Sequence, residues 1–432
     1  MSATQELSNT EVRVQVHRKP ACRIEMHVKI SPQLIKEGRR NAIREVSKEI
    51  SLPGFRKGRA PEEMILKKFP DEVEKQSHKA IADLAFVAAQ KIANVPVLNN
   101  RSPISFDLKN QITAEGAEVV FSFETEPKVP EVDPKSFVAK PVTKAEVGEK
   151  QIEEAIRQML FFYAEWKLVY DRPIQDGDYI MIDLDTVEAD HVQNVFHHIR
   201  FEVSKERMAN WMKNLVTGAK AGDVLDGMSE PDEGAPEMQP KKVRLTILKV
   251  EEATLPELND EFAKKVGASD IPHMRQSIAD LLHRQVDDKA HTELREQVND
   301  YLIATYAFDL PQSLIDTENK HRFNQLMQDP KFKAKWNQMS KEERKEWEGK
   351  LSAESSEAVR LFYLSRQLVQ SAKIPITHQE VQNAAIAMYE SHGARNVEID
   401  KMSKEIYALA LSKIILVKAQ DYVLQTAGDK KA

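Results

Sequence analysis

The sequence predicts a multidomain, elongated α+β protein, and three observations support this expectation. The chain has 432 residues, which at roughly 100–200 residues per domain corresponds to two to four domains. Charged residues make up 30% of the chain, so much of the side-chain surface must remain in water. Only 14 residues are glycine, about 3% against a usual ~7%. Few glycines mean few tight turns, which favours long helices and several small cores over many short strands.

Residues 1–126 predict an α+β domain. In residues 23–30, four apolar side chains alternate with polar ones, the signature of a half-buried strand. Ser31 and Pro32 then provide a helix N-cap and a proline at the first helical position, so we expect a helix to about Ile50. The remaining expected elements are helices from residue 61 and over 71–94, and strands over 104–108 and 118–125.

The rest of the chain divides into three parts. Residues 127–170 begin with a proline-rich segment that predicts an extended linker, and they continue as a helix expected over 149–170 that packs with the C-terminal domain. Residues 171–252 contain short alternating strands and one short helix, which predict a β-rich module. Residues 253–432 are almost wholly helical, because apolar residues recur three and four positions apart.

Composition excludes several classes of protein. The 62 basic and 68 acidic side chains give a net charge of -6, so any attraction to phosphate must come from a local patch. A single cysteine, Cys22, excludes a disulfide framework and a Cys-based zinc cluster, and it fits a reducing compartment. No apolar run reaches the ~18–20 residues needed to cross a bilayer, and the polar N-terminus lacks the order of a secretory signal. We expect no membrane partner and a cytoplasmic location.

The segment GFRKGRAP, Gly54–Pro61, is the sharpest local signal. Two glycines bracket Phe55, Arg56 and Lys57, so the backbone can turn tightly on both sides of an aromatic and basic tip. Between Lys36 and Lys68 there are ten basic and five acidic residues. An exposed phenylalanine suggests a partner that buries it, and adjacent cations suit phosphate or acidic protein surfaces. The residues alone leave open a solvated turn with Phe55 folded back into the core.

This segment resembles the ribosome-docking signature of bacterial trigger factors, in which the motif lies at the tip of a helix–loop–helix. The resemblance extends along the chain in the family's order: an N-terminal docking domain, an FKBP-like prolyl isomerase domain, and an all-α C-terminal domain with arms. Further matching segments are Val129–Asp133, Lys220–Asp223, Val250–Phe262 and Leu310–Asp316. The resemblance implies that Gly54, Phe55, Arg56, Lys57, Gly58, Arg59 and Pro61 form the ribosome-binding loop.

The resemblance also implies a ribosome-associated chaperone that uses neither ATP nor another cofactor. Its partners would be a ribosomal protein and rRNA at the tunnel exit, together with nascent and unfolded polypeptides whose hydrophobic segments it shields. Weak self-association off the ribosome is a further expectation. Five methionines of the C-terminal half predict either an adaptable client surface or ordinary helix core: Met274, Met327, Met339, Met388 and Met402.

The middle module departs from its family's pattern. FKBP-type isomerases rotate the X–Pro bond in an aromatic-lined apolar pocket, lowering a barrier of ~18–20 kcal/mol without a nucleophile or metal. Only two of the five corresponding side chains here are aromatic: Leu184, Phe201, Trp211, Met212 and Val243. We therefore expect a degenerate pocket with reduced activity. The alternative is an active peptidyl-prolyl cis-trans isomerase that the flanking domains deliver to substrates.

Other chemistry has weaker support. His191, His197 and His198 lie close together, but clustered histidines without cysteine or spaced carboxylate partners are usually polar strand and loop residues, so we expect no metal site. The sequence contains no GxxxxGK[ST] motif and nothing that indicates a Ser-His-Asp or Cys-His nucleophile. An RNA-binding scaffold that uses the basic face over 36–68 is a further alternative, against which the net charge of -6 counts.

Overall fold

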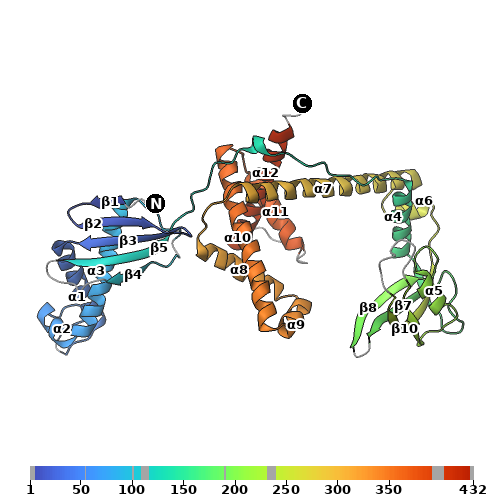
Figure 1. Cartoon of the computed structure of the whole chain (residues 1–432), viewed down its shortest axis with the longest axis horizontal. Helices are drawn as coiled ribbons and strands as arrows, with labels where there is room; N and C mark the ends of the chain where they lie inside the picture. Colours follow the sequence, from blue (N-terminus) through green and yellow to red (C-terminus); the bar gives the residue numbers. More distant parts are fainter. Residues whose placement is uncertain are drawn as a thin grey trace. The chain divides into compact units, whose positions relative to one another are not determined.

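The computed structural model describes residues 5–53, 55–99, 102–108, 116–188, 191–230, 240–391 and 403–428. The chain forms two compact units, one comprising Met1–Pro141 with Thr292–Ala432 and the other comprising Val142–His291. The first unit therefore combines the N-terminal domain with most of the C-terminal helices, and the second contains the β-rich module (Figure 1). The division into four parts that the sequence suggests stays a prediction.

The N-terminal domain is an antiparallel sheet packed against helices (Figure 1). Its strand order is β1-β2-β3-β5-β4, with β1 at Gln5–Ser8, β2 at Val12–Arg18, β3 at Arg23–Ile30, β4 at Ser105–Leu108 and β5 at Ala117–Glu124. Val28 on β3 lies between Val14 and Val119 of the neighbouring strands, and all three side chains are fully buried. The alternation in residues 23–30 thus forms the predicted half-buried strand.

Three helices complete this domain: α1 at Pro32–Glu49, α2 at Glu62–Lys68 and α3 at Pro70–Ala93. The predicted N-cap is confirmed, because the Ser31 side chain accepts a hydrogen bond from the Leu34 N–H. A Cβ at Gly38 would lie 2.5 Å from Ile81 Cγ1, so glycine is what lets α1 approach α3 closely. This packing fixes the direction in which α1 carries the loop that follows it.

The second unit holds the β-rich module, an antiparallel sheet of order β6-β10-β7-β8 with β9 paired to β10. Its strands are β6 at Glu165–Leu168, β7 at Tyr179–Glu188, β8 at His191–Glu202, β9 at Val224–Met228 and β10 at Lys242–Thr254, with helix α5 at Asn210–Val216. Helices α4 (Glu149–Phe162), α6 (Asp260–Lys265) and the first part of α7 (Ile271–Thr305) share a separate small core around Ile156, Phe262 and Met274.

The helix expected over 149–170 is wrong in its second half. Helix α4 ends at Phe162, and Glu165–Leu168 forms strand β6 instead. Glu165 pairs with Thr254 and Leu168 pairs with Glu251, at the far end of the module's sequence. Pairing between distant segments overrides the local helical period, and the module accordingly closes at residues 165 and 254.

The C-terminal helical body consists of the end of α7 with α8 (Gln312–Leu326), α9 (Pro330–Gln338), α10 (Lys341–Ser371), α11 (His378–Ser391) and α12 (Lys404–Gly428). The predicted linker packs onto this body through Val132 and Phe137, and it contains the short 3-10 helix η1 at Pro134–Ser136. The Asp133 N–H donates to the Tyr306 hydroxyl at 2.8 Å, and the Tyr301 hydroxyl donates to the Asp133 carbonyl at 2.9 Å. None of the helices within the described ranges is long and apolar enough to span a bilayer.

Candidate functional site

The loop between α1 and α2 is held by one buried side chain at its start and by hydrogen bonds within its own backbone. Leu52 is buried in a small core with Ile43 and Ile65, which pins the start of the loop to both helices. The Phe55 N–H donates to the Leu52 carbonyl at 3.0 Å, and the Arg59 N–H donates to the Arg56 carbonyl at 2.9 Å. These two bonds hold the backbone at Phe55 and at Arg59, on either side of Arg56 and Lys57.

The side chains at the tip face water. Phe55 is 38% exposed, and Arg56, Lys57 and Arg59 are also exposed. Phe55 is therefore not folded back into the core, which was the alternative that the sequence left open. Within the described ranges, the three cationic side chains have no carboxylate partner at ion-pair distance, so their charge is available to a ligand.

Gly58 and Pro61, two further residues of the predicted loop, shape its backbone. Gly58 adopts a left-handed backbone conformation with φ +79°, as the turn requires. Pro61 is exposed and immediately precedes α2, where its fixed φ suits the entry to a helix. Gly54 lies outside the described residues. A cleft of ≈ 400 Å³ between α1 and the loop is lined by charged side chains that include Arg44, Lys48 and Glu62.

The five predicted pocket residues of the β-rich module lie in one cluster. Leu184, Met212 and Val243 are buried, with only 3–4% of each residue exposed, and Phe201 and Trp211 pack against them while partly exposed. The aliphatic members therefore fill the core of the module. Only the two aromatic members present surface at the edge of the cluster.

One aromatic neighbour of this cluster was missed in the sequence. Phe196 pairs with Leu184 across β7 and β8, and its ring centroid lies 5.5 Å from that of Phe201. Strict alternation would put Phe196 and Phe201 on opposite faces of the strand. The register between β7 and β8 shifts between Ile182 and Leu184, and the extra residue brings both rings into the same cluster.

Two side chains with perturbed pKa values are not suited to acid–base or nucleophilic chemistry at neutral pH. The pKa of the Cys22 thiol is raised to about 11, mainly by burial and to a smaller extent by the nearby carboxylates of Asp309 and Glu124. Little of the reactive thiolate is therefore present at neutral pH. Burial also raises the pKa of Tyr179 to about 12. The neighbouring Arg157 donates two hydrogen bonds to the Glu202 carboxylate, at 2.7 and 2.6 Å. This ion pair stabilises the fold and does not indicate a catalytic group.

The predicted client methionines have mixed positions. Met274 is 2% exposed in the core around Ile156, so it does not offer a client surface. Met327, Met339 and Met388 are partly exposed, and Met402 lies outside the described residues. Four leucines of the C-terminal helices are more exposed than the described methionines and were not singled out in the sequence: Leu281, Leu326, Leu409 and Leu411.

Comparison with known proteins relates the whole chain to one family. Two models of the bacterial trigger factor protein match, one over residues 12–159 and one for its C-terminus over 270–419. Trigger factors of Protochlamydia amoebophila and Chlamydia pneumoniae are each 26% identical, over 96% and 98% of this chain and 96% and 97% of their own. A solved structure of a trigger factor chaperone aligns over 98% of this chain and 99% of its own, with a TM-score of 0.55 and 18% identity.

The fold and the exposed loop define a multidomain protein in which a mixed N-terminal domain, a β-rich middle module and a helical C-terminal body follow one another. The family models together span more than half of the chain and occur in the expected order. The chain belongs to the bacterial trigger factor family.

Proposed function

We propose that this chain docks on the ribosome through the loop tip formed by Phe55, Arg56 and Lys57, with Arg59 beside it. As a member of the trigger factor family, the protein is a ribosome-associated chaperone that binds unfolded substrates. The observation that carries the loop assignment is a backbone-bonded tip with an exposed phenylalanine and three exposed cations that have no ion-pair partner in the described part of the chain. The ring would enter an apolar pocket on a ribosomal protein, and the cations would contact its acidic side chains or nearby rRNA phosphates.

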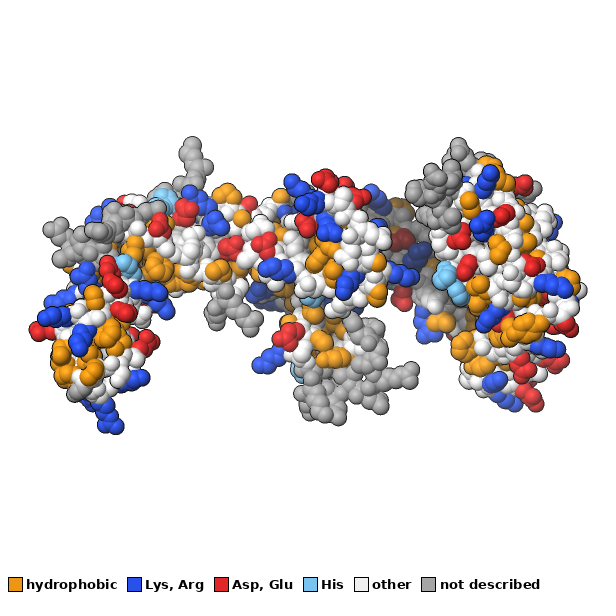
Figure 2. Space-filling view, turned by 90° about the horizontal axis from the view of Figure 1, so that it is seen from below, with side chains coloured by type: hydrophobic (Ala, Val, Ile, Leu, Met, Phe, Trp, Pro, Cys, Tyr) orange, Lys and Arg blue, Asp and Glu red, His pale blue; other side chains and the backbone are white. Residues whose placement is uncertain are grey.

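Client binding fits the distribution of apolar surface. On the face drawn in Figure 2, hydrophobic side chains appear in several small patches. Leu326, Leu409 and Leu411 are between 37% and 43% exposed on the C-terminal helices. Several weak apolar contacts hold an aggregation-prone segment without ATP, and they release it once the client buries the same groups in its own core. Action beside the ribosome places the protein in the cytoplasm, and weak self-association off the ribosome belongs to the same proposal.

Prolyl isomerisation is a reduced activity in this proposal. Leu184, Met212 and Val243 occupy positions where the family pattern has a more aromatic pocket, and they are buried in the module's core. Phe196, Phe201 and Trp211 remain close together, so an apolar edge survives. An efficient isomerase delivered by its flanking domains is the second candidate, and this aromatic edge is the observation in its favour.

Ribosome co-sedimentation tests the docking assignment. The triple variant Phe55→Ala, Arg56→Ala and Lys57→Ala should lose binding while its circular dichroism stays unchanged, because these exposed side chains contribute little to the core. The matched control Val87→Ala, Lys91→Ala and Arg18→Ala removes one exposed apolar and two exposed cationic side chains of the same domain outside the loop. Undiminished binding by the loop variant, or equal loss in the control, contradicts the assignment.

A protease-coupled assay on a short prolyl peptide separates the two candidates for the middle module. We expect a kcat/KM more than about tenfold below that of an ordinary FKBP, which corresponds to a loss of at least about 1.4 kcal/mol in transition-state stabilisation. The variant Phe201→Ala tells whether any residual activity arises at this cluster, since it should lower that activity further. A value close to that of an ordinary FKBP would favour the isomerase.

A further inference from the structure

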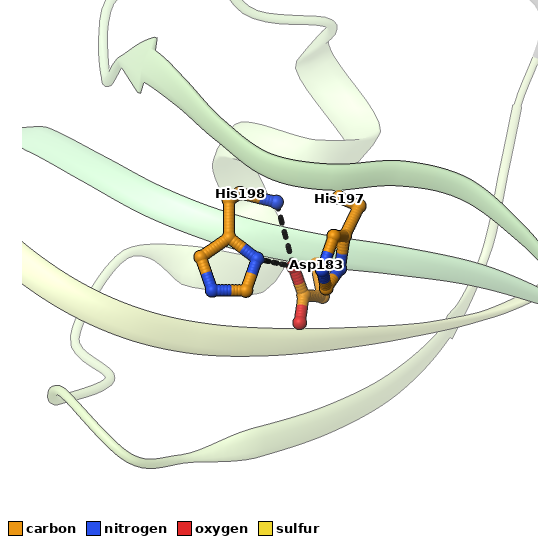
Figure 3. Close-up of side chains that lie close together, drawn as sticks. All are labelled: Asp183, His197 and His198. Carbon is orange, nitrogen blue, oxygen red and sulfur yellow. Dashed lines mark hydrogen bonds and ion pairs between the residues drawn. The ribbon is translucent and has the colours of Figure 1, made fainter. Parts of the chain in front are cut away.

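A carboxylate and two imidazoles converge on the β-rich module, at residues next to Leu184 and Phe196 of the apolar cluster. Asp183 lies on β7, and His197 and His198 lie on β8 (Figure 3). The Nδ1 atoms of His197 and His198 are 3.1 and 3.3 Å from Asp183 Oδ1, and one ligand atom from each residue lies within 4.8 Å of the others. Figure 3 shows the carboxylate between the two rings.

The local backbone produces this convergence. Neighbouring residues of a regular strand point to opposite faces, so His197 and His198 should not both reach one side chain. The register of β7 against β8 shifts at this point, and His198 has φ +53°, in the left-handed region that is unfavourable for a residue with a Cβ. A β-bulge of this kind redirects a side chain, and here it turns two imidazoles to the solvent side of the sheet.

We propose that Asp183, His197 and His198 bind a divalent transition-metal ion. Zinc–nitrogen and zinc–oxygen bonds of about 2.0–2.2 Å in a tetrahedron put neighbouring donor atoms about 3.4 Å apart. The two nitrogen–oxygen separations of 3.1 and 3.3 Å are close to that edge, and the two imidazoles offer ligand atoms within 4.8 Å of each other, so the rings need to approach one another to enclose an ion. Each Nδ1 must present its lone pair to the ion, so an Nδ1 proton moves to Nε2 of the same ring or to water when the ion enters.

The surroundings of the three ligands also suit an ion. The His198 N–H donates to Asp183 Oδ1 at 2.7 Å, which holds the carboxylate in place beside the imidazoles. The side chains of His197 and His198 are 67% and 56% exposed, so an ion can enter from solvent and complete its coordination with water. Asp183 is only 21% exposed, which limits the number of rotamers it must give up on binding.

The ligand set predicts which metals bind. Imidazole nitrogens with one carboxylate favour Cu²⁺, Ni²⁺ and Zn²⁺ over Mg²⁺ and Ca²⁺, which prefer sites made of oxygen. Because only three protein ligands hold the ion on an exposed surface, we expect the bound ion to exchange readily with solvent. Asp183 is adjacent to Leu184 and His197 is adjacent to Phe196, so the ion would join β7 to β8 beside the apolar cluster.

Isothermal titration of the untagged, metal-stripped full chain with NiCl₂ and ZnCl₂ tests the proposal, with MgCl₂ as the hard-cation comparison. Wild type should bind one Ni²⁺ or Zn²⁺ saturably, and the variants His197→Ala/His198→Ala and Asp183→Asn should each weaken binding by about tenfold or more. The control His283→Ala/His291→Ala removes two exposed histidines from α7 and should bind as wild type. Circular dichroism of every variant excludes unfolding as the cause of a loss.

Three outcomes would overturn the site. One is the absence of saturable binding by wild type, and another is equal affinity in wild type and the His197→Ala/His198→Ala variant. The third is loss of binding in the α7 control, which would place the ion elsewhere. A direct readout is the NMR signal of the imidazole protons: Zn²⁺ should shift those of His197 and His198 and leave those of His283 unmoved.

Discussion

Gly58 donates its backbone N–H to the carbonyl of Ser47 at 2.9 Å, and this bond closes the proposed docking loop onto the last turns of α1. The Phe55 N–H is bound to Leu52 in the same loop, so both sides of the tip are fixed while its side chains face water. A recognition element ordered before binding loses less conformational entropy when it meets its partner. The conformation of Gly58 should therefore contribute to ribosome affinity.

The first prediction concerns that conformation. Gly58 has φ +79°, and a side chain there costs about 1–2 kcal/mol. Space is not the obstacle, because the nearest atom to an added Cβ is Lys48 Cγ at 3.9 Å. Gly58→Ala should lower ribosome affinity by about 5–30-fold, since the strain shifts the loop away from its docking conformation. Fluorescence titration of labelled protein with ribosomes measures the change.

Gly218→Ala is the matched control for this prediction. Gly218 has φ +89° and nothing within 4 Å of an added Cβ, so the substitution introduces similar strain in the other unit. It should leave ribosome affinity unchanged. Equal affinities for wild type and Gly58→Ala would mean that the loop's order in the free protein does not matter for docking.

The second prediction concerns salt. Arg56, Lys57 and Arg59 have no ion-pair partner among the described residues, so the tip offers at most about three phosphate contacts. A plot of log affinity against log salt should then have a slope of roughly -1 to -3, because each phosphate contact contributes somewhat less than one unit. A slope steeper than about -5 would instead indicate an RNA-binding face that extends over residues 36–68. Replacing Arg59 by Ala should make the slope shallower by up to about one unit.

The turn at Gly58 and the exposed cationic tip could be predicted because their signals are local, whereas the docking role of the loop stays a prediction. Glycines, a proline and a basic run within Gly54–Pro61 specify turns and charge regardless of what packs elsewhere. The start of α1 could be predicted from the sequence for the same reason, since Ser31 caps a helix whose first residue is proline. In both places the chain within a few residues determines the conformation.

The second unit shows where such reasoning fails. Strand β6 exists because Glu165–Leu168 pairs with residues far away in β10, and the local period suggested a helix. The neighbours of Leu184 and Asp183 depend on a bulge in β8, which sequence alternation cannot place. Phe196 and the carboxylate beside His197 and His198 were missed for this same reason.

The third prediction concerns the pH dependence of α11. The pKa of the Glu380 carboxyl is lowered from 4.5 to about 2. The largest cause is the hydrogen bond that Lys418 donates, and the hydrogen bonds that Thr377 donates are the next largest. Its folded pKa is depressed, so its stabilisation is fully present above about pH 4.5 and is lost as the pH falls towards 2. Glu380→Gln should lower the hydrogen-exchange protection of α11 amides at pH 6. The difference from wild type should shrink between pH 4.5 and pH 3.

Glu390→Gln provides the control for that experiment, because Glu390 is an exposed carboxylate in the last turn of the same helix. It should not reproduce the pH-dependent difference. A deficit in the Glu380 variant that is the same at every pH would show that the substitution acts through packing and not through the charge of the carboxylate.

The fourth prediction concerns the division of labour between the module and the helices. Replacing residues 165–254 by a short Gly-Ser linker should preserve most anti-aggregation activity in a light-scattering assay with an unfolded client. Glu165 pairs with Thr254, so the cut ends lie side by side, and the core around Ile156 and Phe262 is retained. Deleting only residues 171–250 leaves β6 and the end of β10 as exposed edges, so that variant should aggregate more readily. If the 165–254 replacement stays folded but no longer suppresses client aggregation, then the β-rich module itself, and not the helical body, carries the client contacts.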